Sequence, residues 1–126
     1  MSGLTLTVLN DTYTIHRLGH SSPIPLNVLE AGFYAITKTD EELSIVCPAS
    51  IAIEGSKKDS GWSCLKVSGP LDSSLTGILA KISNALAQAQ ISIFAISTYN
   101  TDYILVKSEN VESAKNALVN AGYNFL

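Results

Sequence analysis

The sequence predicts an α+β protein made of two small units packed together, each with an antiparallel sheet and its helices on one face. Residues 62–126 show strand and helix patterns in the order β-α-β-β-α-β, which is the ferredoxin-like arrangement. A pair of strands after a short helix recurs in the first half, as in a degenerate repeat. A unit of about 60 residues buries only about 60% of its unfolded surface, so we expect both halves to be ferredoxin-like and to pack together.

The first strand and helix of the second unit follow from hydrophobic periodicity. The segment "WSCLKVSG", from Trp62, alternates enough to form a strand. It is followed by a turn with Gly69 and Pro70, and then by apolar residues at helical spacing that give a helix one buried face. These residues are Leu75, Ile78, Leu79, Ile82, Leu86 and Ala89.

The rest of the second unit reads as a hairpin, a helix and a short strand. The runs "ISIFAIST" and "YILVK" are rich in β-branched and aromatic residues, and "YNTD" between them predicts a hairpin. In "SENVESAKNALVNAG", Ser108 is the expected N-cap and Gly122 the expected end of a helix. The closing "YNFL" predicts a short strand.

The first unit has a weaker pattern. Its segments "LTLTVL" and "TYTIHRL" predict two strands joined at Asn10 and Asp11. A short helix is expected in "PLNVLEAG", followed by a hairpin of "FYAITKT" and "LSIVCP" that turns at "DEE". Glycine, serine and charged residues cluster in "EGSKKDSGW", residues 54–62, and predict a linker or long loop. We therefore expect domains at 1–60 and 61–126.

Composition excludes several classes of function. The 126 residues carry 8 Lys plus Arg against 11 Asp plus Glu, and no basic block suits a nucleic-acid backbone. Hydrophobic residues make up 46% of the chain and charged ones only 15%, which favours further burial in a homodimer. No apolar run approaches a membrane span, and "MSGLTLTVLND" lacks the pattern of a signal peptide, so we expect a cytoplasmic protein without membrane contact.

The sequence offers little for catalysis, metals or cofactors. Cys47 and Cys64 are too few and too far apart for a disulfide framework or a zinc site, and are expected to be reduced and packed as small hydrophobic residues. His16 and His20, in "HRLGH", would bind a metal at this spacing only on a helix, and here the pattern is a strand ending at a glycine turn. We expect both histidines to be exposed or partly buried bystanders, and the protein not to be an enzyme.

One candidate binding segment is "SGPLDSSLTG", at the strand-to-helix junction. Free N–H groups at a helix N-terminus, together with the helix dipole, favour a carboxylate. Asp72, Ser73 or Ser74 could equally be the N-cap that satisfies the same N–H groups from within the chain. The candidate ligand residues of this segment are Ser68, Gly69, Pro70, Leu71, Asp72, Ser73, Ser74, Thr76 and Gly77.

A second candidate segment is the polar tip of the predicted hairpin. It comprises Ser97, Thr98, Tyr99, Asn100, Thr101 and Asp102. Plain turn chemistry explains it equally well, since Asn and Asp favour tight turns. In the expected topology, however, Asp102 could face a neighbouring unit and pair with an ammonium or guanidinium group.

These segments carry a family resemblance. With "GPLDSSLTGILA" followed by "ISIFAISTYNTDYILVK", the sequence resembles the tandem ACT-domain proteins, similar to the ACT modules of aspartate kinases and of the CASTOR cytosolic arginine sensors. "GFYAITKTDEELSIVCP" is similar to the hairpin of the first ACT-like half in those proteins. The resemblance implies two ACT-type units and a regulatory function without catalysis.

The resemblance also implies a ligand, usually an amino acid, held at an interface between ACT units, and a regulated protein partner. It implies that Asp102, which corresponds to an acid of the family, lies near the ligand, and it implies the same less firmly for Asp72. Two positions depart from the family pattern: Ser73 stands where a bulky residue is usual, and Asn100 replaces an acid. Both departures favour the alternative, a ligand-free ACT-fold scaffold that acts through dimerisation or a partner.

Overall fold

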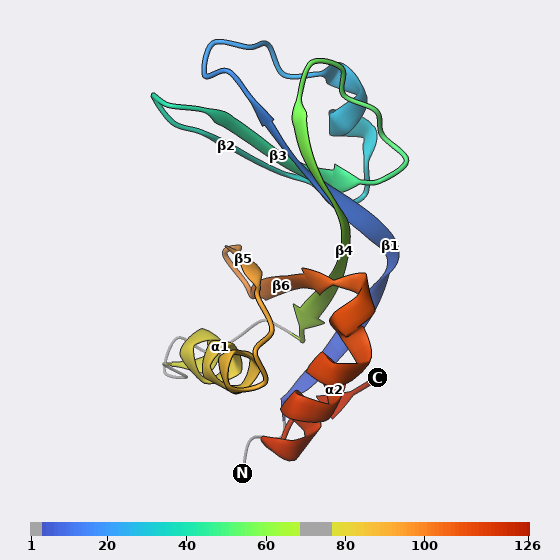
Figure 1. Cartoon of the computed structure of the whole chain (residues 1–126), viewed down its shortest axis with the longest axis vertical. Helices are drawn as coiled ribbons and strands as arrows, with labels where there is room; N and C mark the ends of the chain where they lie inside the picture. Colours follow the sequence, from blue (N-terminus) through green and yellow to red (C-terminus); the bar gives the residue numbers. More distant parts are fainter. Residues whose placement is uncertain (1–3, 69–76) are drawn as a thin grey trace. The chain divides into compact units, whose positions relative to one another are not determined.

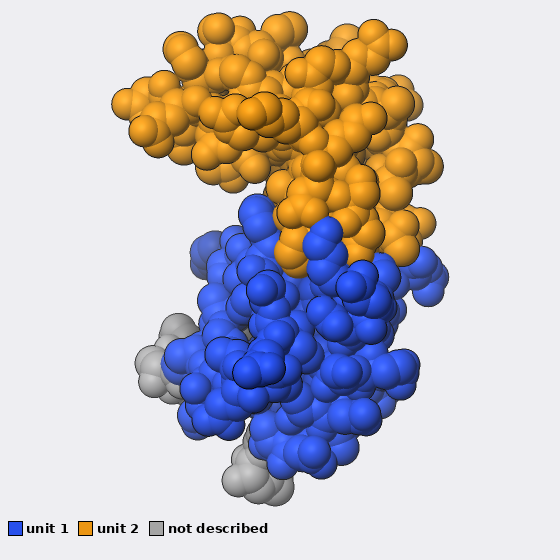
Figure 2. Space-filling view, in the orientation of Figure 1, with its two compact units in different colours: residues 1–10, 63–126 blue, residues 11–62 orange. Residues whose placement is uncertain are grey.

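Two compact units make up the chain, for which the computed structural model describes residues 4–68 and 77–126 (Figures 1 and 2). Unit 1 comprises the residues up to Asn10 together with Ser63–Leu126, and unit 2 comprises Asp11–Trp62. The strands are ordered β2 (Ala35–Lys38), β3 (Leu43–Pro48), β1 (Thr5–Leu18), β4 (Lys57–Val67), β6 (Asp102–Lys107) and β5 (Phe94–Ser97), and β7 (Asn124–Phe125) pairs with β1 outside this path. The expected boundary after residue 60 therefore differs from the observed units, because the first residues of the chain group with the last ones.

The first strand is longer than predicted. β1 is continuous over Thr5–Leu18, so the turn expected at Asn10 and Asp11 is not formed. Both side chains are exposed on the strand, and solvent satisfies them without a turn. The polar pair instead marks the point where the chain passes from unit 1 to unit 2.

The segment expected as a linker is mostly strand. β4 spans Lys57–Val67, and only residues 54–56 precede it as a turn and a short connection. The residues from Lys57 to Gly61 are exposed, whereas the stretch from Trp62 to Leu65 is buried. The charged residues and the glycine therefore form the solvent-exposed start of this strand and do not interrupt it.

Unit 2 contains the predicted short helix and hairpin. The short helix is a 3₁₀ helix, η1 (Leu26–Glu30), and β2 (Ala35–Lys38) pairs antiparallel with β3 (Leu43–Pro48). The unit's core consists of Val28, Leu43, Ile45, Cys47 and Ile53. All of residues 11–62 are described and none lies in an α-helix, so this half does not form the second ferredoxin-like unit that we expected.

Unit 1 has the predicted order of elements. After β4 come α1 (Ile78–Gln88), β5 (Phe94–Ser97), β6 (Asp102–Lys107), the 3₁₀ turn η2 (Ser108–Asn110), α2 (Val111–Asn120) and β7 (Asn124–Phe125). β7 pairs in parallel with β1, where Leu6 lies opposite Phe125. The core lies between the helices and the sheet and includes Leu6, Leu65, Val67, Ile82, Leu86, Ile104, Val106 and Leu118.

The ends of α2 differ in how well they follow the prediction. Gly122, at φ 101°, ends the helix as predicted, and the N–H of Tyr123 returns to the carbonyl of Leu118 at 3.0 Å. Ser108 is not the N-cap; its Oγ lies 2.8 Å from Ser63 Oγ on β4. α2 begins after Asn110, which makes no side-chain cap bond.

In the part of the chain that the structure describes, no helix has the length and hydrophobicity that crossing a bilayer requires.

Candidate functional site

The predicted polar hairpin tip is a compact turn held by two threonines. Ser97 and Asp102 form the last residue pair of the β5–β6 ladder. Across the turn, the Thr98 N–H donates to the Thr101 carbonyl at 2.8 Å, and the Thr98 hydroxyl donates to the same carbonyl at 3.1 Å. The Thr101 N–H returns to Thr98 Oγ1 at 3.3 Å. The tip residues Tyr99 and Asn100 are exposed, so their side chains are open to a partner or ligand.

Asp102 places a carboxylate at the base of this turn. Its Oδ1 accepts a hydrogen bond from Ser97 Oγ at 2.6 Å, a short bond of the kind that a charged acceptor forms. The Asp102 side chain is half-buried. No cation among residues 4–68 and 77–126 forms an ion pair with it, so its negative charge is available to a positively charged group.

Thr101 connects the turn to the end of β4. Its side chain is buried, and its hydroxyl donates to the Val67 carbonyl at 2.6 Å. Ser68, the residue after Val67, is exposed, and its N–H donates to the Thr5 carbonyl of β1 at 2.8 Å. The hairpin turn therefore contacts the end of β4 at Val67, the residue directly before the first candidate segment.

Only the two ends of the first candidate segment can be placed. Ser68 follows β4, and Gly77 precedes α1 with φ 77°, a left-handed conformation that favours glycine. Gly69, Pro70, Leu71, Asp72, Ser73, Ser74 and Thr76 lie outside the described residues. The two readings of this segment, an internal helix cap or the wall of a ligand site, therefore both stay predictions.

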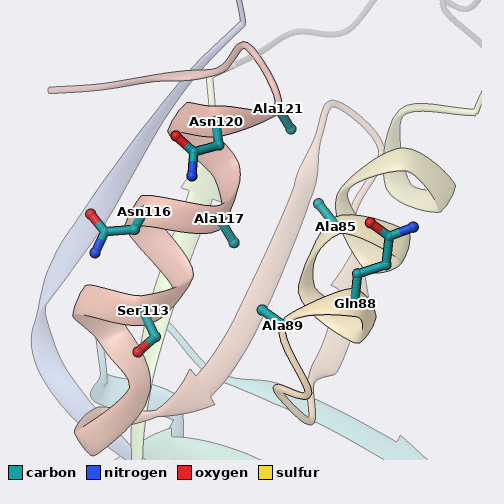
Figure 3. A pocket seen from close by; sticks show the side chains of 8 residues that line it. All are labelled: Ala85, Gln88, Ala89, Ser113, Asn116, Ala117, Asn120 and Ala121. Atoms are coloured by element: carbon teal, nitrogen blue, oxygen red, sulfur yellow. The ribbon is translucent and has the colours of Figure 1, made fainter.

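Sequence reasoning did not anticipate two surface hollows, and neither contains a predicted site residue. A groove of about 610 Å³ lies between α1 and α2. Figure 3 shows Ala85 of α1 and Ala89, just after it, pointing toward α2, with Ala117 of α2 and Ala121, just after it, pointing back. Ser113 and the amides of Gln88, Asn116 and Asn120 complete its lining. The only signal in the sequence was the repeated spacing of alanines by four residues.

The second hollow, of about 380 Å³, belongs to unit 2. Its lining is mostly apolar, with Glu54 as its acidic residue. The lining residues are Leu18, Ser22, Pro23, Ile24, Pro25, Ala52, Ile53, Glu54 and Gly55. The hollow therefore lies within unit 2, apart from the residues that the sequence singled out.

His16 is more buried than expected, with 1% of its surface exposed. Ser56 Oγ donates to the Ile53 carbonyl at 3.0 Å and lies 2.9 Å from His16 Nδ1. Because the serine has a single hydroxyl proton, Nδ1 must be the donor in the second bond. Nε2 is then the unprotonated nitrogen, and it is buried without a hydrogen-bond partner. Burial and, less strongly, Lys58 lower the pKa of His16.

The cysteines are buried free thiols, as the sequence predicted. Burial raises the pKa of Cys47, and it raises the pKa of Cys64 to about 12. Within the described ranges, no three His, Cys, Asp or Glu side chains group into a possible metal site. Thiols that are buried and protonated in this way are poor nucleophiles, so they give no chemical basis for catalysis.

Comparison with known proteins identifies the class. The family model for the ACT domain matches residues 57–120, which run from the start of β4 to the end of α2. The chain belongs to the ACT domain family. A second family model, for an N-terminal domain, matches residues 11–52, which lie within unit 2.

Individual proteins and structures are also similar to this chain. The chain is 28% identical to the cytosolic arginine sensor for mTORC1 subunit 1 of Pongo abelii over 126 residues, covering 90% of this chain and 37% of that protein. It spans about a third of the length of the curated relatives that it matches. A crystal structure of an Agrobacterium tumefaciens protein is 39% identical, with a TM-score of 0.93, and the match covers 100% of this chain and 94% of that one.

A more distant structure shares the fold. The regulatory subunit of aspartate kinase from Thermus thermophilus, in its ligand-free form, is 16% identical with a TM-score of 0.68. The match covers 95% of this chain and 99% of that subunit. Both the predicted α+β fold with its mostly antiparallel sheet and the ACT resemblance seen in the sequence are thus confirmed.

Proposed function

We propose that this protein is a regulatory module that binds an amino acid and has no catalytic activity of its own. The observation that carries the proposal is the hydrogen bond from Thr101 to Val67, which brings the hairpin tip to the end of β4. Support also comes from the ACT family match and from relatives named as an arginine sensor and as a regulatory subunit.

In this proposal, the two segments bind opposite ends of the amino acid. Asp102 pairs with the ammonium or a basic side chain, because its carboxylate is accessible and not engaged in an ion pair with a described cation. The segment from Gly69 to Gly77 binds the carboxylate through backbone N–H groups, whereas Ser68 contributes its hydroxyl, because its N–H already donates to the Thr5 carbonyl. Asp72 is a second candidate for the positive group, and Gly69 lets the ligand approach the backbone closely.

Regulation would then follow from linkage. A ligand shifts a conformational or assembly equilibrium only by its difference in affinity for the two states. We propose that the protein forms a homodimer in the cytoplasm, and that the ligand changes its affinity for a regulated protein partner. Light scattering tests the dimer directly, because the dimer should have twice the 13.4 kDa mass of one chain.

The first test is a thermal-shift screen with each of the twenty amino acids at millimolar concentration. A ligand at a hundred times its Kd adds about 2.7 kcal/mol of stability and raises the midpoint by several degrees. Asp102→Ala should abolish the response to the amino acid that stabilises the wild type. Asp40→Ala, which removes an exposed acid of the β2–β3 turn, is the matched control and should keep it.

Ser97→Ala separates the charge of Asp102 from its internal hydrogen bond. It removes the donor to Asp102 Oδ1 and leaves the carboxylate in place, so ligand stabilisation should persist. An unchanged response in Asp102→Ala would contradict the role of this residue.

The alternative function is a ligand-free ACT scaffold. Tyr99 favours it, since a fully exposed aromatic side chain at a hairpin tip is better suited to contact the surface of a partner protein than to bind a small ligand. Ser73 and Asn100, which depart from the family pattern, favour it as well. A stable dimer that responds to none of the amino acids would support the scaffold and contradict amino-acid binding.

A further inference from the structure

Thr101 lies within the segment predicted to bind ligand, but its side chain is 7% exposed and its hydroxyl is already used. Its Oγ1 donates to the Val67 carbonyl at 2.6 Å, from the turn after β5 to the last residue of β4. A hydroxyl has only one proton to donate. Thr101 is therefore poorly suited to donate a hydrogen bond to a ligand while this contact is present.

The bond acts where the pairing of β4 ends. Val67 is the last residue of β4, and the N–H of the next residue, Ser68, donates to the Thr5 carbonyl at 2.8 Å. The carbonyl of Val67 and the N–H of Ser68 thus have partners on two different neighbours, a turn and a strand. Together these bonds hold both sides of the peptide group between Val67 and Ser68, where β4 ends.

The turn itself is fixed by separate bonds. Thr98 bonds to the backbone N–H and carbonyl of Thr101, and none of these contacts reaches β4. Among the hydrogen bonds between side chains and backbone in the described turn, only that of the Thr101 hydroxyl crosses to Val67. Thr98 and Thr101 therefore share a residue type and a turn, but only Thr101 bonds from the turn to the end of β4.

We propose that Thr101 is a positioning residue that couples the hairpin tip to Val67 and Ser68 at the end of β4, so that the tip and Ser68 keep one relative placement before a ligand binds. The coupling itself does not depend on the proposed function, whereas the expected effect on ligand affinity rests on it. A site that is placed in advance binds more tightly, because less ordering is needed on binding. Losing the bond should therefore weaken binding even though Thr101 does not contact the ligand.

The test compares Thr101→Val, Thr101→Ser and Thr98→Val in the full chain. Valine keeps the shape of threonine but lacks the hydroxyl, whereas serine keeps the hydroxyl. Amide hydrogen exchange measured by NMR at Ser68 reports the coupling without any ligand. We expect exchange at Ser68 to be about tenfold faster in Thr101→Val, the size of one lost hydrogen bond, and near the wild-type rate in the other two variants.

The ligand arm uses the amino acid that stabilises the wild type most among the twenty. Its Kd should rise about tenfold in Thr101→Val and change less than threefold in Thr101→Ser. Thr98→Val serves only in the exchange measurement, where it controls for a general loss of stability because it removes hydrogen bonds from the same turn.

Each outcome separates this inference from the proposed function. If Ser68 exchanges equally fast in both valine variants, the coupling is wrong, whatever the ligand does. If the coupling is seen but binding is unchanged in Thr101→Val, the claimed effect on affinity is wrong. If no amino acid binds the wild type while Ser68 still responds to Thr101→Val, amino-acid binding is wrong and the coupling stands.

Discussion

His16 is the residue whose protonation the fold opposes most clearly. Its ring is buried, Nδ1 bonds to Ser56, and Nε2 has no partner. Protonation would bury a charge and an unpaired N–H, which explains the lowered pKa. Because the unfolded chain has the ordinary value of about 6.5, it binds more protons than the folded protein just below that pH. The stability due to neutral His16 is therefore fully present above pH 6.5 and is lost as the pH falls through the folded-state pKa.

We expect His16→Gln to lose less stability than the wild type when the pH falls from 7.5 to 5. Urea unfolding at several pH values in this range measures the difference in slope. His20→Gln removes an exposed histidine and should follow the wild type. If His16→Gln and the wild type show parallel curves, the buried imidazole does not control this pH dependence.

At the scale of elements, α1 ends with an unusual residue. Gln90 has φ 62°, in the left-handed region that glycine usually occupies after a helix, and the Ile91 N–H returns to the Leu86 carbonyl at 2.9 Å. α2 ends with the same type of bond, from Tyr123 to Leu118, but has Gly122 at the left-handed position. Both helices therefore end with the geometry that glycine favours, but α1 has Gln90 at the left-handed position, a conformation that its side chain disfavours.

We expect Gln90→Gly to raise the free energy of unfolding by about 0.5–1 kcal/mol, because glycine adopts this conformation without steric cost. Gln88→Gly, two residues earlier at the last position of α1, should lower it by up to about 1 kcal/mol. Both side chains are exposed, so packing does not complicate the comparison. Urea unfolding checks the pair, and a loss of stability in both variants would contradict this account of the helix end.

At the scale of the whole molecule, the two units are not successive halves of the sequence. Leu6 is fully buried in the core of unit 1, among residues such as Ile104 and Leu118 that follow it by about 100 positions. The backbone contacts are equally distant in sequence, since the Leu126 N–H donates to the Leu6 carbonyl at 3.0 Å. The start of the chain therefore completes the unit that the end of the chain builds.

We expect Leu6→Ala to lower the free energy of unfolding by about 2–5 kcal/mol, because it leaves a cavity in a core. Leu26→Ala, at a side chain that is 77% exposed, should change it by less than about 0.5 kcal/mol. Hydrogen exchange locates the effect: amides of Ile104 and Leu118 should lose at least as much protection as that of Ile45 in unit 2. A loss confined to Ile45 would favour the division at residue 60.

Sequence periodicity was sufficient for elements that are defined locally. The strand and helix order of residues 62–126, the end of α2 at Gly122 and the β2–β3 hairpin follow from alternation, helical spacing and turn residues. The same local signals misled where exposure explained polarity. Asn10 and Asp11 lie on a continuous strand, and Lys57–Gly61 form the exposed start of β4, because strand residues that face water need not be apolar.

The sequence by itself determined the ACT family, the order of elements in the second half and the two polar segments that became candidate sites. Only the tertiary structure decided that β7 pairs with β1, that Leu6 belongs to the core of unit 1, and that Thr101 bonds to Val67. The physical reason is distance along the chain. Periodicity reports which face of an element is buried, whereas the partner of a strand or hydroxyl depends on hydrogen bonds between residues that are tens of positions apart.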